Sequence, residues 1–266
     1  MFPDKNNTLG SGKLYFAPFI TGTKTKAGPQ EYFGNTPSLS MSTSIETLDH
    51  MDADNGIRTK DASVVTSIDR TGSFATDHVS PKNLAKWFGG TASKVTQVAA
   101  TAQTETLTLK HGGRYQLGES VQNPSGLRGL TLTSIATTAT TPVPLVLNTD
   151  FTFDGETGGV TVLPGSTVVP DDDIGIEVLV TYGVSETTYN RIVSGNQTIE
   201  GELFFRADNG AGLNQDYLWP NVKISPDGDM ELKGEDWQTL PFSIEVLKRD
   251  DATEAVYVNG RPGSGI

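Results

Sequence analysis

Within residues 36–46, serines and larger side chains alternate strictly from Ser38 to Ile45. Leu39, Met41, Thr43 and Ile45 take one set of alternate positions. The positions between them are serines, namely Ser38, Ser40, Ser42 and Ser44. Because successive side chains of a β-strand point to opposite faces, this pattern predicts a strand with one core face and one small, hydrated face. The serine face is either an ordinary solvent-facing surface or a specialised lining surface.

The rest of the chain also favours strands. It has 29 glycines, 14 prolines and no cysteine, and only 35% of its residues are hydrophobic. Such a composition is typical of many short strands joined by tight turns around a modest core. We expect a mainly β fold, an antiparallel β-sandwich or partial barrel, whose strands include 37–47, 62–73, 198–206 and 240–248. Disulfides and thiolate metal sites are excluded because there is no cysteine.

The sequence changes in texture near residue 94 and again near 195. The intervening stretch is rich in Thr, Val and Gly, poor in aromatic residues, and contains strand-turn-strand units such as 147–163. We therefore predict a core domain formed by residues 1–95 and 195–266. Residues 96–194 would form an inserted subdomain that resembles a β-sandwich.

A polar acidic segment follows the serine-rich strand. It contains Asp49, His50, Met51, Asp52, Asp54 and Asn55, and a second extended run follows it. The Asn-Gly pair at 55–56 indicates a turn, so a long β-hairpin with a mobile acidic tip at 48–61 is expected. A calcium loop of the EF-hand type is disfavoured because its fifth and twelfth positions hold Gly56 and Ser63.

One short helix is predicted between residues 80 and 88. Ser80 suits the N-cap, Pro81 suits the first helical position, and two glycines follow Phe88. Leu84, Trp87 and Phe88 lie at spacings of three and four, so they would form an apolar face that packs on a sheet.

Signatures of catalysis and of ligand binding are missing from the sequence. The nucleophile elbow, the Walker loop and the zinc-binding helix motif are absent, and the three histidines lie far apart. We therefore predict no catalytic, cofactor-binding or metal-binding residues and expect a protein that is not an enzyme. The formal net charge of −12 disfavours tight binding of a phosphate backbone, and the sequence predicts neither a signal peptide nor a membrane span.

The order of these elements resembles the major tail tube proteins of long-tailed bacteriophages, of the siphovirus-like kind. The resemblance rests on the alternating strand, the long acidic-tipped hairpin, the short helix with Trp-Phe, and the late strand Phe-Ser-Ile-Glu-Val-Leu-Lys-Arg-Asp-Asp. It covers residues 30–90 and 195–250 best and includes no invariant motif.

This resemblance implies a structural subunit that forms hexameric rings, which stack into a hollow tail tube through which DNA passes. The hairpin tip would contact the next ring, and Ser38, Ser40, Ser42 and Ser44 would be candidates to face the lumen. Implied partners are identical subunits, a tape-measure protein, passing double-stranded DNA, and terminator and baseplate proteins at the tube ends. The protein would be made in the host cytoplasm and reside in the virion tail.

Other functions are compatible with the same residues. The chain can be another β-rich virion component, such as a capsid decoration or baseplate protein. Alternatively, Thr/Gly-rich strands and three tryptophans are found in carbohydrate-binding proteins and glycosidases, whose paired carboxylates have no fixed sequence spacing.

Overall fold

The computed structural model of the chain describes residues 7–54 and 56–261. It is mainly β with antiparallel sheets, as predicted, and its sheets do not close into a barrel. The chain divides into two compact units, residues 1–93 with 191–266 and residues 94–190. The division expected from the sequence lies at 95/96 and 194/195. Strands β5 (Thr91–Gln97) and β12 (Thr187–Val193) pair with each other where the chain passes from one unit to the other.

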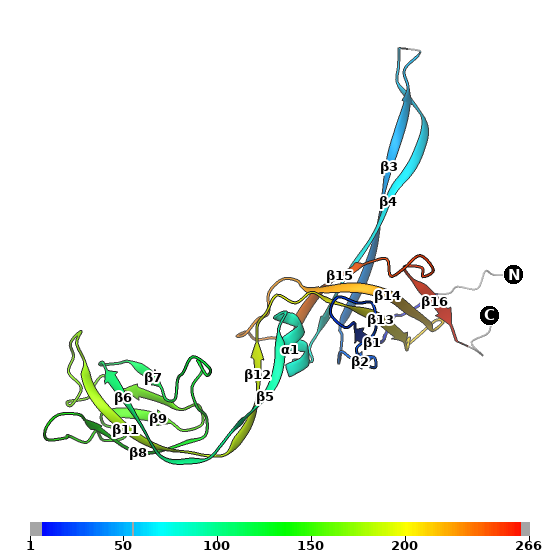
Figure 1. Ribbon diagram of the computed structural model, residues 1–266. Helices are drawn as coiled ribbons and strands as arrows, with labels where there is room; N and C mark the ends of the chain where they lie inside the picture. The colour runs from blue at the N-terminus through cyan, green and yellow to red at the C-terminus, as the bar shows by residue number, and fades with distance from the viewer. Residues whose placement is uncertain (1–6, 55, 262–266) are drawn as a thin grey trace. The chain divides into compact units, whose positions relative to one another are not determined.

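The first unit is built on an eight-stranded sheet (Figure 1). Seven strands follow the order β2-β1-β13-β14-β15-β4-β3, and β16 pairs with β14. Their bounds are β1 Gly12–Pro18, β2 Glu31–Tyr32, β3 Ser38–Asp52, β4 Thr59–Thr76, β13 Ile199–Ala207, β14 Gln215–Pro226, β15 Leu240–Val246 and β16 Tyr257–Gly260. The strands expected at 37–47, 62–73, 198–206 and 240–248 correspond to β3, β4, β13 and β15.

One face of this sheet carries the hydrophobic core of the unit. Cross-strand pairs such as Phe242 with Phe74 and Ile244 with Ile224 bring alternate apolar residues together on this face. Phe33, which follows β2, lies among them, with its ring centroid 4.9 Å from that of Phe74 and 5.9 Å from that of Phe242. These buried aromatic rings hold the strands in register because a shift by one residue would expose them.

Helix α1 (Pro81–Trp87) contacts β14 and β15 on this core face, as its sequence signals predict. The Ser80 hydroxyl accepts a hydrogen bond from the Asn83 amide, and Pro81 opens the helix. Leu84 and Trp87 pack against the core. Phe88 differs from the prediction because it is the C-cap residue and 39% exposed, with its ring edge-on to Trp87.

The paired strands of the β3–β4 hairpin are longer than the sequence suggested, with two register shifts along them. Asp49, His50, Met51 and Asp52 belong to β3 instead of the expected mobile tip. They pair with Ser63, Ala62, Lys60 and Thr59, so β3 ends at Asp52 and β4 begins at Thr59. The strands continue because the charged side chains find partners across the hairpin: the Lys60 ammonium lies 2.6 Å from the Asp49 carboxylate, and His50 lies 2.6 Å from Asp61.

The second unit is a small sandwich with its own core. One three-stranded sheet contains β6 (Ala100–Leu109), β11 (Ile176–Val184) and β8 (Leu130–Thr137), in the order β6-β11-β8. The other contains β7 (Arg114–Gln116), β10 (Gly159–Val162) and β9 (Phe151–Asp154), in the order β7-β10-β9. Buried residues of both sheets, including Val178, Val180, Val160 and Phe151, form one hydrophobic cluster.

Candidate assembly surface

The serines of β3 lie on the sheet face opposite the hydrophobic core. Their face continues across the sheet, because Ser40 pairs with Ser73 of β4, Ser73 with Ser243 of β15, and Ser243 with Ser225 of β14. Four serines therefore stand in one row across four strands. The Ser40 and Ser73 hydroxyl oxygens lie 3.1 Å apart, and the Ser243 hydroxyl donates to the Ser225 carbonyl at 3.4 Å.

The next row on this face is also polar. It places Ser42 beside Thr71, Thr71 beside Glu245, and Glu245 beside Lys223. The Lys223 ammonium lies 3.5 Å from the Glu245 carboxylate. With Ser38 and Ser44 at its two ends on β3, this serine face is a broad surface of small hydroxyl side chains with few charges. The sequence indicated only the part of the serine face that lies on β3, because the rows depend on the register of strands far apart in the chain.

The hairpin extends beyond the other strands of its sheet (Figure 1). β15 pairs with residues 71–76 of β4, so residues 43–52 and 59–70 pair only with each other in the described chain. We call residues 42–70 the arm. Side chains on both faces of the arm are exposed. The sequence predicted that Met41, Thr43 and Ile45 face a core, and this prediction is wrong. No second layer formed by the described residues covers these side chains, since the core ends near Leu39 and Phe74.

The exposed side chains of the arm include many large apolar groups. Ile45 and its cross-strand partner Ile68 are 58% and 47% exposed. The others are Leu48, Met51, Ile57, Val64 and Val65. Monomeric soluble proteins seldom display so many apolar side chains on one projecting element, and such clusters usually mark interaction surfaces.

The acidic residues near the end of the arm are bonded within the hairpin. The Asp49 carboxylate accepts hydrogen bonds from Lys60 at 2.6 Å and from the Ser63 hydroxyl at 2.7 Å. The hydrogen bond from Lys60 is the main cause that lowers the pKa of Asp49. Asp52 accepts from the amide of Asp54 at 3.0 Å, which shapes the turn. Asn55 lies outside the described residues.

A groove of about 750 Å³ lies on the core side of the sheet, beyond the helix. Phe205, Tyr217 and Trp219 form one wall, and Leu39 and Met41 of β3 form part of the other. The two walls come from different parts of the same sheet, so the sheet curls toward a partial barrel that stays open at this groove. The lining includes one cationic side chain, Arg70, and no carboxylate.

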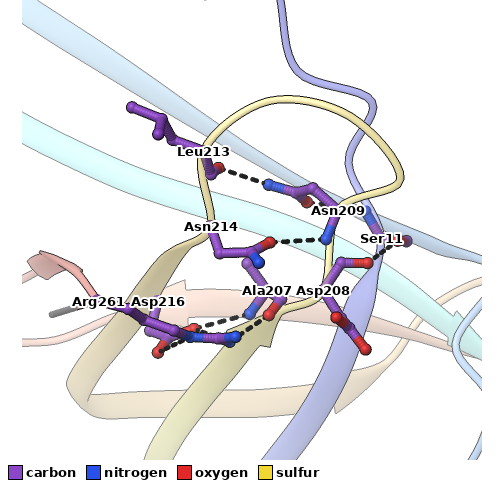
Figure 2. A network of polar contacts seen from close by, with 8 residues as sticks. All are labelled: Ser11, Ala207, Asp208, Asn209, Leu213, Asn214, Asp216 and Arg261. Carbon is purple, nitrogen blue, oxygen red and sulfur yellow. Dashed lines mark hydrogen bonds and ion pairs between the residues drawn. The ribbon is translucent and has the colours of Figure 1, made fainter. Parts of the chain in front are cut away.

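A hydrogen-bonded network ties the ends of β1, β13 and β14 together (Figure 2). Arg261 donates to both carboxylate oxygens of Asp216, at 2.8 and 3.2 Å, and to the carbonyl of Ala207. The Ala207 amide donates to Asp216 at 2.9 Å, and the Ser11 hydroxyl donates to the carbonyl of Asp208. The hydrogen bond from Arg261 is the main cause that lowers the pKa of Asp216. This network fixes the ends of these three strands beside the groove.

Within residues 7–54 and 56–261, no three His, Asp or Glu side chains gather as a metal site would require. In the same residues, no helix has the length and apolarity needed to cross a membrane. In the acidic segment of the hairpin, the Asp49 carboxylate is engaged by Lys60 and Ser63, and the Asp52 carboxylate accepts from the Asp54 amide.

A family model matches residues 7–258 of the chain, under the description "Protein of unknown function UCP028589". The match runs through both units, including the arm, the helix and the second sandwich. No curated protein matches the chain.

Proposed function

The chain belongs to the family described as "Protein of unknown function UCP028589", and from this premise we propose that it is a self-assembling structural subunit of a phage tail tube. In this proposal six copies form a ring, and rings stack into a tube that conducts DNA. A single observation carries the proposal: among the described residues, the arm projects from the sheet with apolar side chains exposed on both faces and with unpaired strand edges.

An isolated two-stranded hairpin is only marginally stable in water, and long uncovered strand edges favour association with other chains. Burial of the seven large apolar side chains of the arm against neighbouring copies would contribute on the order of 1 kcal/mol or more for each. A contact that joins different surfaces of two copies closes into a ring or continues as a filament. A tube built from one kind of subunit needs both kinds of contact: one that closes into a ring and one that continues from ring to ring.

The chemistry of the serine face supports a role in lining a channel for DNA. Small, mostly uncharged hydroxyl groups hydrate well and offer few cations to a phosphate backbone. We propose that this face, from Ser38 to Ser44 and across to Ser225, lines the lumen, and that the second unit lies outside it. Because each copy carries a formal charge of −12, we expect a lumen of net negative potential that DNA passes without adhering. A basic lumen in an assembled tube would contradict this part.

The test of the proposal uses two matched double variants. Ile45→Thr with Ile68→Thr removes apolar surface from the arm, whereas Val98→Thr with Val121→Thr removes exposed apolar surface from the second unit. Negative-stain images of concentrated wild-type protein should show tubes with six-fold rings. We expect the arm variant to need roughly tenfold higher concentration to assemble, and the control variant to behave like wild type.

Two results would contradict the proposal. One is a wild-type protein that stays monomeric at every concentration. The other is a small closed oligomer without stacking, which would favour a capsid decoration or baseplate component. Binding to a glycan array would instead favour the carbohydrate-binding alternative.

A further inference from the structure

The loop at residues 227–239, which joins β14 to β15, displays the most exposed tryptophan of the chain. Trp237 is 92% exposed and Leu232 is 80% exposed. The base of the loop is held in place, since Met230 packs against the core and the Gln238 side chain donates to the Glu231 carbonyl at 2.9 Å. A large apolar ring presented on an anchored loop is typical of a residue that inserts into a partner.

The same loop is strongly acidic. Its five carboxylates against one lysine give a formal charge of −4: Asp227, Asp229, Glu231, Glu235 and Asp236 against Lys233. All six side chains belong to exposed residues. A partner surface for this loop would therefore combine cationic groups with aromatic rings.

The structure contains a surface of that kind on β1, β2 and β13, on the same sheet face as the serines. Tyr15 lies between Tyr32 and Phe204, with ring centroids 5.5 and 6.3 Å apart. Lys13 and Arg206 pair directly across the two strands, and the Lys13 ammonium lies 5.8 Å above the Tyr32 ring. We call these five residues the aromatic-cationic patch.

The two cations of the patch are poorly compensated. Like charges directly opposite each other on paired strands are unfavourable. Neither Lys13 nor Arg206 forms an ion pair within 4.0 Å in the part of the chain that the structure describes. Arg206 contributes to the lowered pKa of Asp216, but that carboxylate is already engaged by Arg261 and by the Ala207 amide. An acidic partner would relieve this repulsion.

The loop cannot reach the patch of its own chain. Phe204 pairs with Leu218 of β14, whereas the loop begins nine residues later at Asp227. At about 3.3 Å per residue this separation is about 30 Å along the strand. The loop runs out and back over thirteen residues, so its tip can cover only about 20 Å.

We propose that the loop at 227–239 of one copy docks on the aromatic-cationic patch of a second copy, with Trp237 against the Tyr32 and Tyr15 rings and its carboxylates beside Lys13 and Arg206. The inference rests on the proposed function, to which it adds a named contact between copies. The loop and the patch are different surfaces, so the contact is heterologous and propagates around a ring or along a filament.

Charge reversal with rescue tests the electrostatic part on the full chain. Lys13→Glu with Arg206→Glu, and separately Glu235→Lys with Asp236→Lys, should each raise the concentration needed for assembly at least about tenfold. The four changes together should restore most of the assembly. Lys94→Glu with Lys110→Glu makes the same change of net charge in the second unit and should have little effect. Failure of the quadruple variant to recover would overturn the charge pairing.

A photo-cross-link locates the contact directly. Benzoylphenylalanine in place of Trp237, in a mixture of isotopically labelled and unlabelled protein, should join peptides of two different copies. Mass spectrometry should identify the acceptor peptide within residues 13–32 or 204–206. The same probe in place of Phe88, which lies on the helix, should not label that peptide.

The outcomes separate this inference from the proposed function. Tubes without a cross-link to the patch would overturn the inference and leave the proposed function standing. A cross-link between copies in a protein that never forms rings would support the contact and overturn the tube. A monomer that gives no cross-link would overturn both.

Discussion

Ala102 is a residue whose backbone conformation carries a cost. Its φ is +54°, in the left-handed region, although it lies inside strand β6. The register between β11 and β6 shifts close by, between Tyr182 and Val184, so the conformation belongs to an irregularity in the pairing. Left-handed alanine is strained by about 1–2 kcal/mol, whereas glycine adopts this conformation freely.

We therefore expect Ala102→Gly to stabilise the protein by about 1 kcal/mol, even though the same change usually destabilises a strand. The measurement is urea unfolding followed by circular dichroism. Ala136→Gly, on β8 at a position without positive φ, is the matched control and should lose about 0.5–1 kcal/mol. Equal losses in both variants would show that Ala102 is not strained.

Asp216 should make stability depend on pH. Its pKa in the folded protein is lowered by Arg261, below the unfolded value of about 3.9. Its stabilising contribution is thus fully present above the unfolded pKa and is lost as the pH falls through the folded pKa. Asp216→Asn should lower the unfolding midpoint at pH 7, and the difference from wild type should shrink below about pH 3. Asp208→Asn, at the exposed neighbouring site, should have a much smaller effect at either pH.

At the scale of elements, the apolar residues of helix α1 and its C-cap differ in how far they are buried. Leu84 packs against the core of the first unit, whereas Phe88 at the C-cap is partly exposed. Leu84→Ala should therefore cost about 2–3 kcal/mol of unfolding free energy, and Phe88→Ala less than about 1 kcal/mol. Chemical denaturation of both variants measures the difference. If Phe88→Ala cost as much unfolding free energy as Leu84→Ala, the predicted packing face of Leu84, Trp87 and Phe88 would be correct.

For the arm, the sequence predicted the two strands but neither their full length nor their exposure on both faces. The alternation at 38–45 and the second run at 62–74 predicted two strands, and the structure has both. Their extension through Asp49–Asp52 depends on cross-strand partners such as Lys60, which a single-strand pattern does not reveal. The helix was predicted almost to the residue, because Ser80 and Pro81 act on their immediate neighbours.

At the scale of the whole molecule, the second unit is self-contained. It has its own buried cluster and connects to the first unit through the paired strands β5 and β12. If it lies outside the proposed tube, replacing residues 98–186 by a short Asn-Gly turn should leave tube formation intact. Negative-stain microscopy of the purified deletion variant is the measurement. Soluble, folded protein that no longer assembles would refute the peripheral placement.

Local patterns in the sequence determined the mainly β class, the short helix, the serines on one face of β3 and the change of texture near residues 94 and 195. Each of these depends on residues within a few positions of one another, where backbone geometry acts directly. Only the tertiary structure decided that Ser40, Ser73, Ser243 and Ser225 form one row and that the arm is left uncovered by the other described residues. The register of the sheet arises from pairing between segments up to about 200 residues apart. The alternation of side chains along a strand is the same whether or not another layer packs against it, so the sequence pattern does not reveal which faces are buried.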